Sequence, residues 1–228
     1  MTQEMIDGSL VALPEDDGGE ARCAVVLALD CSYSMSGDPI AELNAGLTEF
    51  LSALQTDDLA ARRCDVALVT FGGSVKIAQP FTLVSNLAAM PTLKAGGGTP
   101  MGEAICTAID QITTRKAQYR QEGRAQYRPW IFLLTDGQPT DDVNQAQVKV
   151  QQGDANKSFQ FFAVGCFSAD MHTLKTIAPP SIPPVYLRGA NFRDMFKWLS
   201  DSMGRVASST PGQQVALPAA SGWAQISS

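Results

Sequence analysis

Short apolar runs, separated by segments with helical periodicity, constrain the fold of this chain more than any other feature of its sequence. Four runs are apolar almost throughout, which is typical of strands buried on both faces of a parallel sheet. They span residues 23–30, 64–71, 129–135 and 158–166. Because strands that alternate with helices form a mostly parallel sheet covered on both faces, the sequence predicts an α/β fold.

Amphipathic helices are predicted between these strands. The first has Asp38 as its expected N-cap and Pro39 as its first helical residue. Its apolar residues recur three or four positions apart, as one face of a helix requires. They are Ile40, Leu43, Leu47, Phe50, Leu51 and Leu54. Further helices are expected to begin near Pro100 and near Asp141, and a last one is expected over residues 192–203.

One strand is expected to run against the others. Gly72 and Gly73 form a two-residue hairpin signal, so residues 74–81 are predicted to return antiparallel at the sheet edge. Pro80 suits an edge because proline cannot donate a hydrogen bond to a neighbouring strand. Residues 185–187 are a candidate for a short last strand. The predicted fold class is therefore a Rossmann-like, doubly wound, mostly parallel sheet with one antiparallel edge strand and helices on both faces.

The length of 228 residues fits one domain with tails. Residues 1–20 are acidic and are expected to form an N-terminal tail. The domain itself is expected to span residues 21–206. Residues 207–228 are small, polar and contain proline and glycine, so they are predicted to be a flexible C-terminal tail with Trp223 as a candidate anchor.

Charge and cysteine content limit the function classes. The net charge of −6 argues against nucleic acid as a partner, because phosphate binding needs clustered Lys and Arg. No apolar stretch reaches the roughly 18 residues of a membrane span, and residues 1–20 lack the basic region of a secretory signal. The five cysteines contain no C-x-x-C pair. We therefore expect reduced thiols and a cytoplasmic location.

Polar side chains gather where ligands bind in open parallel sheets, beyond the carboxyl ends of the strands. The set consists of Asp30, Ser32, Ser34, Thr99 and Asp136. These two carboxylates and three hydroxyls are hard oxygen ligands, which Mg²⁺ prefers to sulfur or imidazole, and Mn²⁺ and Ca²⁺ accept the same ligands. Glycines 96–98 give their loop backbone conformations closed to other residues, so it can approach an ion. The sequence therefore predicts a metal site.

This pattern resembles the von Willebrand factor type A (VWA) domain and its metal-ion-dependent adhesion site (MIDAS). The family pattern of Asp-x-Ser-x-Ser, a distant Thr and a distant Asp is matched in order by DCSYSM, GGGT and TDG, and the resemblance covers about residues 22–205. It implies the VWA fold, with Ser and Thr hydroxyls contacting the ion and the carboxylates acting directly or through water. It also implies an open metal position that a partner's Asp or Glu fills, and hence a binding module rather than an enzyme.

The subtype resembles the bacterial cytoplasmic VWA proteins of the tellurium-resistance (TerY-like) group. The stretches that carry this resemblance are DCSYSMSGDPIAELNAGL, GGGTPMGEAI and RPWIFLLTDGQPTDD. It implies a Ser/Thr protein kinase and a protein phosphatase as partners, and an accessory or scaffold role in signalling or stress resistance. Some members carry a cysteine-rich zinc-binding tail, which this sequence lacks.

Other interpretations stay open at this point. The main alternative is a metal-dependent phosphohydrolase of a related α/β fold, although such enzymes have D-x-D where this chain has Ser32. Cys31 could act as a nucleophile with His172, the one histidine of the sequence. Asp30 and Ser32 are also common turn residues. Thr99 is also a candidate helix N-cap.

Four features besides the five site residues also bear on function. Asp141 and Asp142 fit either a helix start or the rim of the site. The basic run over residues 115–128 fits either a solvated helix end or a patch for an acidic partner. Tyr33, between the two serines, is a candidate for partner contact. Residues 208–210 offer hydroxyls for phosphorylation, without a specific motif.

Overall fold

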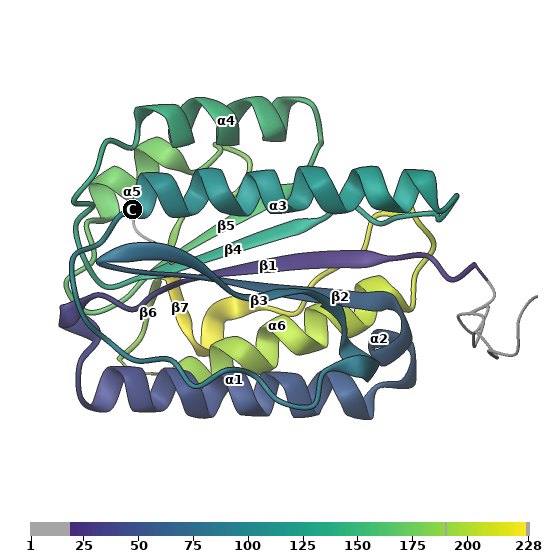
Figure 1. The fold of residues 1–228 in the computed structure, drawn as a ribbon, viewed down its shortest axis with the longest axis horizontal. Helices are drawn as coiled ribbons and strands as arrows, with labels where there is room; N and C mark the ends of the chain where they lie inside the picture. Colours follow the sequence, from purple (N-terminus) through teal and green to yellow (C-terminus); the bar gives the residue numbers. More distant parts are fainter. Residues whose placement is uncertain (1–18, 190, 227–228) are drawn as a thin grey trace, which may run out of the picture.

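A computed structural model describes residues 19–189 and 191–226 of the chain. Strands and helices alternate along it (Figure 1). The strands are β1 (Cys23–Asp30), β2 (Cys64–Gly72), β3 (Ser74–Leu83), β4 (Trp130–Thr135), β5 (Gln160–Gly165), β6 (Val185–Leu187) and β7 (Ala224–Ile226). The α-helices are α1 (Asp38–Thr56), α2 (Asp58–Arg63), α3 (Met101–Gln121), α4 (Asn144–Ala155), α5 (Met171–Ile177) and α6 (Phe192–Ala207). Short 3₁₀ helices are η1 (Tyr33–Met35), η2 (Val84–Asn86) and η3 (Ala220–Gly222).

The seven strands form one sheet in the order β3-β2-β1-β4-β5-β6-β7. Strand β1 pairs in parallel with both β2 and β4, so the strand order reverses between β1 and β4. Strand β3 returns antiparallel to β2 through a tight turn at Gly73, where φ is 70°. The doubly wound, mostly parallel sheet and its antiparallel edge are thus confirmed.

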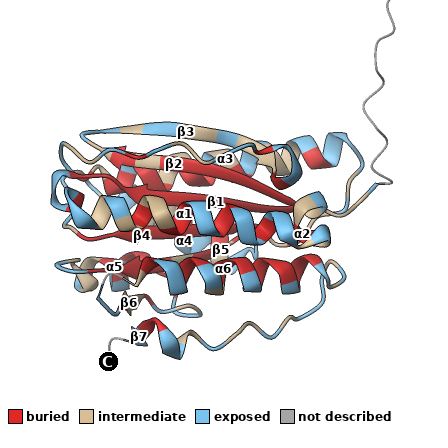
Figure 2. Ribbon diagram, turned by 90° about the horizontal axis from the view of Figure 1, so that it is seen from below, coloured by how far each residue is buried: buried red, intermediate tan, exposed pale blue. Residues whose placement is uncertain are grey.

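Helices cover both faces of the sheet (Figure 1). Helices α1 and α6 lie on one face, and α3, α4 and α5 lie on the other. The eight residues of β1 are all buried (Figure 2), which explains why its sequence is apolar throughout. Alternate β1 side chains enter the two cores: Leu27 belongs to the core that contains Leu47 of α1, and Val26 belongs to the core that contains Ile105 of α3. The continuous apolar sequence of β1 therefore follows from the burial of the strand on both faces of the sheet.

The helix starts differ in detail from the sequence-based expectations. Gly37, with φ 84°, is the N-cap of α1, and Asp38 is its first helical residue, so the helix begins one position earlier than expected. Helix α2 was not anticipated. Its N-cap is Asp57, whose carboxylate accepts hydrogen bonds from the backbone N–H groups of Leu59 and Ala60, both at 3.0 Å.

The C-terminal segment differs from the predicted flexible tail. Strand β7 pairs antiparallel with β6 and gives the sheet a second antiparallel edge, where one was expected. Trp223 is buried, and its ring centroid lies 5.3 Å from that of Trp198. The Trp198 indole N–H also donates to the carbonyl oxygen of Pro218 at 2.8 Å. These contacts attach to β6 and α6 a segment that its composition alone predicted to be a flexible tail. The N-terminal tail expected over residues 1–20 lies almost wholly outside the described residues.

Three basic side chains of the run over residues 115–128 make contacts within the domain. Arg115 lies 3.0 Å from the buried carboxylate of Asp65. The Lys116 ammonium donates to the carbonyl oxygen of Ser158, and Arg128 pairs with Asp154 at 3.0 Å. These contacts favour the structural interpretation of the run. None of the helices in the described part of the chain combines the length and apolar character that crossing a bilayer requires.

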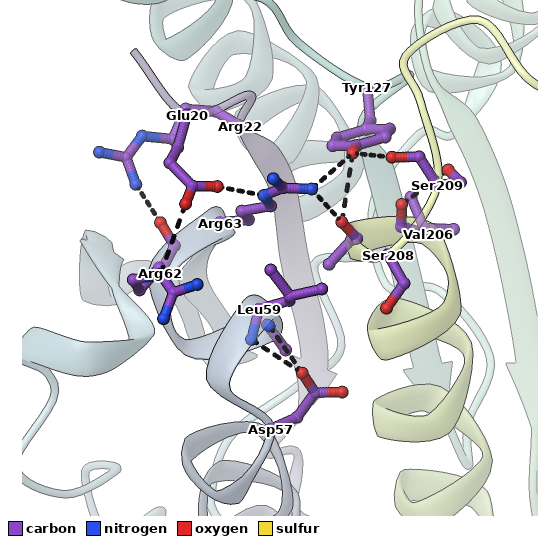
Figure 3. Close-up of polar contacts among 12 residues, drawn as sticks. Glu20, Arg22, Asp57, Leu59, Arg62, Arg63, Tyr127, Val206, Ser208 and Ser209 are labelled. Atoms are coloured by element: carbon purple, nitrogen blue, oxygen red, sulfur yellow. Dashed lines mark hydrogen bonds and ion pairs between the residues drawn. The ribbon is translucent and has the colours of Figure 1, made fainter. Parts of the chain in front are cut away.

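Arg63 directly precedes β2, at the opposite end of the strands from the predicted site, and it joins the two ends of the domain. Figure 3 shows its contacts. Arg63 pairs with the carboxylate of Glu20, just before β1, and its guanidinium donates to the carbonyl oxygen of Ala207 at the end of α6 at 2.6 Å. The Tyr127 hydroxyl donates to the carbonyl oxygen of Ser209 at 2.6 Å beside it. One side chain thus connects α2, the start of β1 and the end of α6.

We expect Arg63→Ala to lower the free energy of unfolding by about 1–3 kcal/mol, because it removes charge-assisted hydrogen bonds that are partly shielded from water. The matched control is Arg193→Ala, whose ion pairs with Glu42 and Glu49 are exposed and should contribute less than about 0.5 kcal/mol. Urea unfolding measures both. Equal losses in the two variants would contradict this role of Arg63.

Candidate metal centre

The predicted site residues meet at the carboxyl ends of β1 and β4, where the strand order reverses. Asp30 is the last residue of β1, and Asp136 directly follows β4. Because β1 and β4 are parallel neighbours, with Leu29 opposite Leu134, their ends lie side by side. Both carboxylates are buried, with exposed fractions of 0% for Asp30 and 2% for Asp136. The fold thus brings two acidic side chains from distant parts of the sequence to one point.

Hydrogen bonds connect four of the five predicted residues. The hydroxyl oxygens of Ser32 and Ser34 lie 2.9 Å apart, and the Ser34 hydroxyl donates to Asp136 Oδ1 at 2.7 Å. The backbone N–H of Ser32 donates to Asp30 Oδ1 at 2.8 Å. Met35 packs beneath this turn and is fully buried. The Asp-x-Ser-x-Ser segment therefore turns both hydroxyls toward the carboxylate of the neighbouring strand.

Thr99 is the fifth member of the cluster. Its hydroxyl oxygen lies 3.3 Å from the point where a Cβ of Gly137 would stand, and Ser34 Oγ lies 3.8 Å from the same point. Thr99 is buried, with an exposed fraction of 5%. It was also a candidate N-cap, but the structure shows no side-chain cap of this kind at the start of α3. All five predicted residues thus lie around one small region.

Glycines allow the loops around this region to touch each other through their backbones. Gly97 has a φ of 77°, which favours glycine, and a Cβ there would stand 2.4 Å from the Cα of Gly73. The backbone N–H of Tyr33 donates to the carbonyl oxygen of Gly97 at 2.9 Å, and that of Gly96 donates to Cys31 at 2.8 Å. The glycine-rich loop is thereby fixed against both the β1 loop and the β2–β3 turn.

Sequence reasoning missed Thr135 as part of the site. Its hydroxyl donates to Asp30 Oδ2 at 2.5 Å and accepts from the backbone N–H of Gly137 at 3.3 Å. Thr135 is fully buried and ends β4. It therefore orients the Asp30 carboxylate. Its place directly before Asp136, at a strand end, is the signal that could have identified it.

Thr140 and Asp141 position the Thr99 loop from the other side. The backbone N–H of Thr99 donates to the Thr140 hydroxyl at 3.0 Å, and the backbone N–H of Thr140 donates back to the Thr99 carbonyl at 2.9 Å. The Asp141 carboxylate accepts from the N–H groups of Gly102 and Glu103 at the start of α3. Asp141 therefore caps α3, not the helix that follows it in sequence. Asp142 is the residue that faces that helix, through Asn144.

The surroundings of the site disfavour the ionised forms of the Asp30 and Asp136 carboxyl groups. Burial raises the pKa of the Asp30 carboxyl, and the charge of Asp136 raises it further, against hydrogen bonds from Ser32 and Thr135 that lower it. Burial likewise raises the pKa of Asp136, against the hydrogen bond from Ser34. Among the described residues, no Lys, Arg or His forms an ion pair with either carboxylate. The cluster thus has negative charge without a counter-charge from the residues that the structure describes.

The donor set fits a hard divalent cation. It contains only carboxylate and hydroxyl oxygens, which suit Mg²⁺, Mn²⁺ or Ca²⁺. In the described part of the chain, no three His, Cys, Asp or Glu side chains form a group that could hold a metal. That is expected here, since three of the five candidate ligands are hydroxyls. A bound cation would supply the missing positive charge.

The structure gives no support to a Cys31–His172 nucleophile. Cys31 is buried in the core, and burial together with the charge of Asp30 raises the pKa of its thiol to about 12. The thiol is therefore protonated at neutral pH, whereas nucleophilic cysteines react as thiolates. His172 is exposed at the start of α5, where its backbone N–H donates to Asp170.

Fold and site together define a doubly wound α/β domain with an oxygen-rich cluster at its topological switch point. The chain belongs to the von Willebrand factor type A domain family, whose sequence model matches residues 24–200. Domains of this family commonly mediate protein–protein interactions.

Known proteins similar to the chain are consistent with this assignment. Human matrilin-3 is 28% identical over 159 residues, which are 68% of this chain and 31% of that protein. The von Willebrand factor type A structure from Catenulispora acidiphila has a TM-score of 0.61 at 19% identity, covering 81% of this chain and 43% of that one. The pilus adhesin SpaC from Lactobacillus rhamnosus GG has a TM-score of 0.62 at 12% identity, covering 82% and 31%. The chain thus spans about a third of the length of matrilin-3, and the two structural matches show the fold alone.

We expect Asp136→Asn to stabilise the metal-free protein at neutral pH. The variant keeps an oxygen to accept from Ser34 but removes a buried charge. Since the folded state raises this pKa above its ordinary 3.8, ionisation weakens folding as the pH rises. The advantage of the variant should therefore shrink as the pH falls toward 3.8, because the carboxyl of the folded state takes up its proton at a higher pH than that of the unfolded state.

Urea unfolding in EDTA, at about pH 7 and about pH 4.5, measures this difference. Asp201→Asn is the control, because Asp201 is exposed and paired with Lys197. A wild type more stable than Asp136→Asn at both pH values would contradict the electrostatic account of the site.

Proposed function

We propose that this chain is a metal-dependent protein-binding module. Mg²⁺, held by Asp30, Ser32, Ser34, Thr99 and Asp136, would engage an acidic residue of a protein partner. One observation carries this proposal: five oxygen-bearing side chains from three loops gather around two buried carboxylates that have no basic partner among the described residues. A cluster built only for stability would gain from an arginine or a lysine there.

The ligand types favour a bridge to an anionic partner. When bound, the cation offers a Lewis-acidic position that accepts a further oxygen ligand. Three of the five protein groups are neutral hydroxyls, so the site compensates the charge of the ion less fully than a set of carboxylates would. A carboxylate from a partner fits this remaining positive charge and the preference of hard cations for oxygen. Mn²⁺ and Ca²⁺ fit the same set.

The proposed module is not an enzyme. The phosphohydrolase alternative requires a second carboxylate two positions after Asp30, where the chain has Ser32, whose hydroxyl bonds to Ser34. No geometric observation favours that alternative.

We further propose that the chain belongs to the TerY-like group and acts in the cytoplasm beside a Ser/Thr protein kinase and a protein phosphatase. The tellurium-resistance context rests on the sequence stretches that resemble this group. The cytoplasmic location is supported by the five free cysteines, since reduced thiols are typical of reducing compartments.

Metal binding can be measured directly. We expect Mn²⁺ to bind the full chain with one site, to raise its unfolding temperature, and to bind Ser34→Ala about tenfold or more weakly, because Ser34 links Ser32 to Asp136. Ser181→Ala is the control, since that serine bonds only to Asp154 away from the site. Isothermal titration calorimetry gives the affinities. Unchanged binding by Ser34→Ala would exclude this site.

Partner binding should depend on the metal. We expect a Ser/Thr protein kinase or a protein phosphatase of the TerY-like context to bind this chain in Mg²⁺ and to lose about tenfold or more in affinity in EDTA. Thr99→Ala should weaken binding in the same way. Equal affinity with and without EDTA would contradict a metal bridge. Failure of both proteins to bind in Mg²⁺ would contradict the proposed kinase–phosphatase context.

A further inference from the structure

Two large aromatic side chains are exposed at the end of the sheet that carries the site. The described residues include four large hydrophobic side chains with high exposure: Tyr33, Ile77, Val148 and Phe167. Only Tyr33 and Phe167, with exposed fractions of 77% and 39%, follow the carboxyl ends of parallel strands. Tyr33 follows β1 and Phe167 follows β5. Since β4 lies between β1 and β5, Asp136 lies between the two aromatic residues.

The backbone of Tyr33 is part of the site. Tyr33 stands between Ser32 and Ser34, whose hydroxyls belong to the cluster, and its N–H donates to Gly97 in the Thr99 loop. Its side chain is exposed, whereas the hydroxyls of the two serines face each other and Asp136. The Tyr33 ring is therefore available to a partner directly beside the cluster.

Phe167 is held rigidly beside Asp136. Its φ of 49° lies in the left-handed region, which costs a non-glycine residue about 1–3 kcal/mol. Hydrogen bonds hold the loop: the Tyr186 hydroxyl donates to the Phe167 carbonyl at 2.5 Å, and the Ser168 hydroxyl donates to the Asp136 carbonyl at 3.0 Å. The centroid of the Phe167 ring lies 6.2 Å from that of the buried Phe192 ring. Strain of this kind is concentrated at functional sites.

A third flank of the site is acidic. A surface groove beside the start of α3, next to the Thr99 loop, is lined by Glu103, Asp141 and Asp142, and also by Asp110, which pairs with the one basic side chain of the lining, Lys149. This flank repels additional carboxylates on a partner. An acidic cluster on the partner would therefore be disfavoured, whereas apolar side chains beside a single carboxylate would meet Tyr33 and Phe167.

We propose that Tyr33 and Phe167 form an apolar rim that selects partner segments carrying one Asp or Glu flanked by large apolar side chains. This proposal rests on the proposed metal-bridged function and specifies its partner. The metal holds the carboxylate, and the rim buries the flanking side chains. Exposed aromatic rings on a fixed backbone suit this role, because they bury much apolar area at little cost in conformational entropy.

The probes are three capped tripeptides, Phe-Asp-Phe, Gly-Asp-Gly and Phe-Ala-Phe, and the protein is the full chain loaded with Mn²⁺. Paramagnetic broadening of the peptide protons by Mn²⁺ reports binding at the site. We expect Phe-Asp-Phe to bind about tenfold more tightly than Gly-Asp-Gly, and Phe-Ala-Phe not to bind measurably. Tyr33→Ser and Phe167→Asn should each reduce the preference for Phe-Asp-Phe, and the double variant should reduce it to less than about twofold.

Controls separate the rim from the metal site. Val148→Ser removes an exposed apolar side chain on α4 and should leave the preference unchanged. Asn tolerates the left-handed conformation, so Phe167→Asn is expected to fold, and Mn²⁺ titration of each variant verifies that the metal affinity is retained. Equal binding of Phe-Asp-Phe and Gly-Asp-Gly would overturn the rim and leave the proposed function standing. Absence of binding by both peptides, or by Mn²⁺ itself, would overturn the proposed function.

Discussion

Two buried carboxylates that have no basic partner among the described residues are the constraint on which the rest of the site depends. Asp30 and Asp136 each bear a raised pKa, and the hydroxyls around them reduce the cost of their charge without removing it. A stable fold tolerates such a pair only where the surrounding backbone fixes it, because buried like charges oppose folding. In this chain Asp30 ends β1 and Asp136 directly follows β4, so the sheet fixes both backbones. The hydroxyls of Thr135 and Ser34 donate hydrogen bonds to the carboxylates of Asp30 and Asp136.

Hydrogen bonds connect the loops around the cluster to one another. The glycine-rich loop contacts the β1 loop, the β2–β3 turn and Thr140, so Thr99 is held from three sides. Asp141 extends this arrangement to the first turn of α3. A displacement of one loop therefore moves its neighbours as well, and the geometry offered to a ligand belongs to the whole strand-end surface.

Much of this architecture was predictable because its signals are local. A strand buried on both faces is apolar throughout, and β1 and β4 were found on that basis. The five candidate residues could be selected from the sequence because each lies at a strand end or in a glycine-rich loop, and the structure brings them together around one region. The contacts of Thr140 and Asp141 with the start of α3 were not predictable, since they join residues about forty positions apart. The C-terminal segment was misjudged for the same reason: its order depends on Trp198 and Trp223, and their contact is not visible in local composition.

The two antiparallel edge strands have a consequence for self-association. An open sheet exposes unpaired backbone groups at its edges, which can pair with another copy of the chain. Here β3 contains Pro80, and its pairing with β2 is irregular on both sides of Leu68 of β2. Strand β7 is only three residues long. Neither edge is a good template for sheet extension between molecules. Pairing between copies of the chain through these two sheet edges is therefore disfavoured.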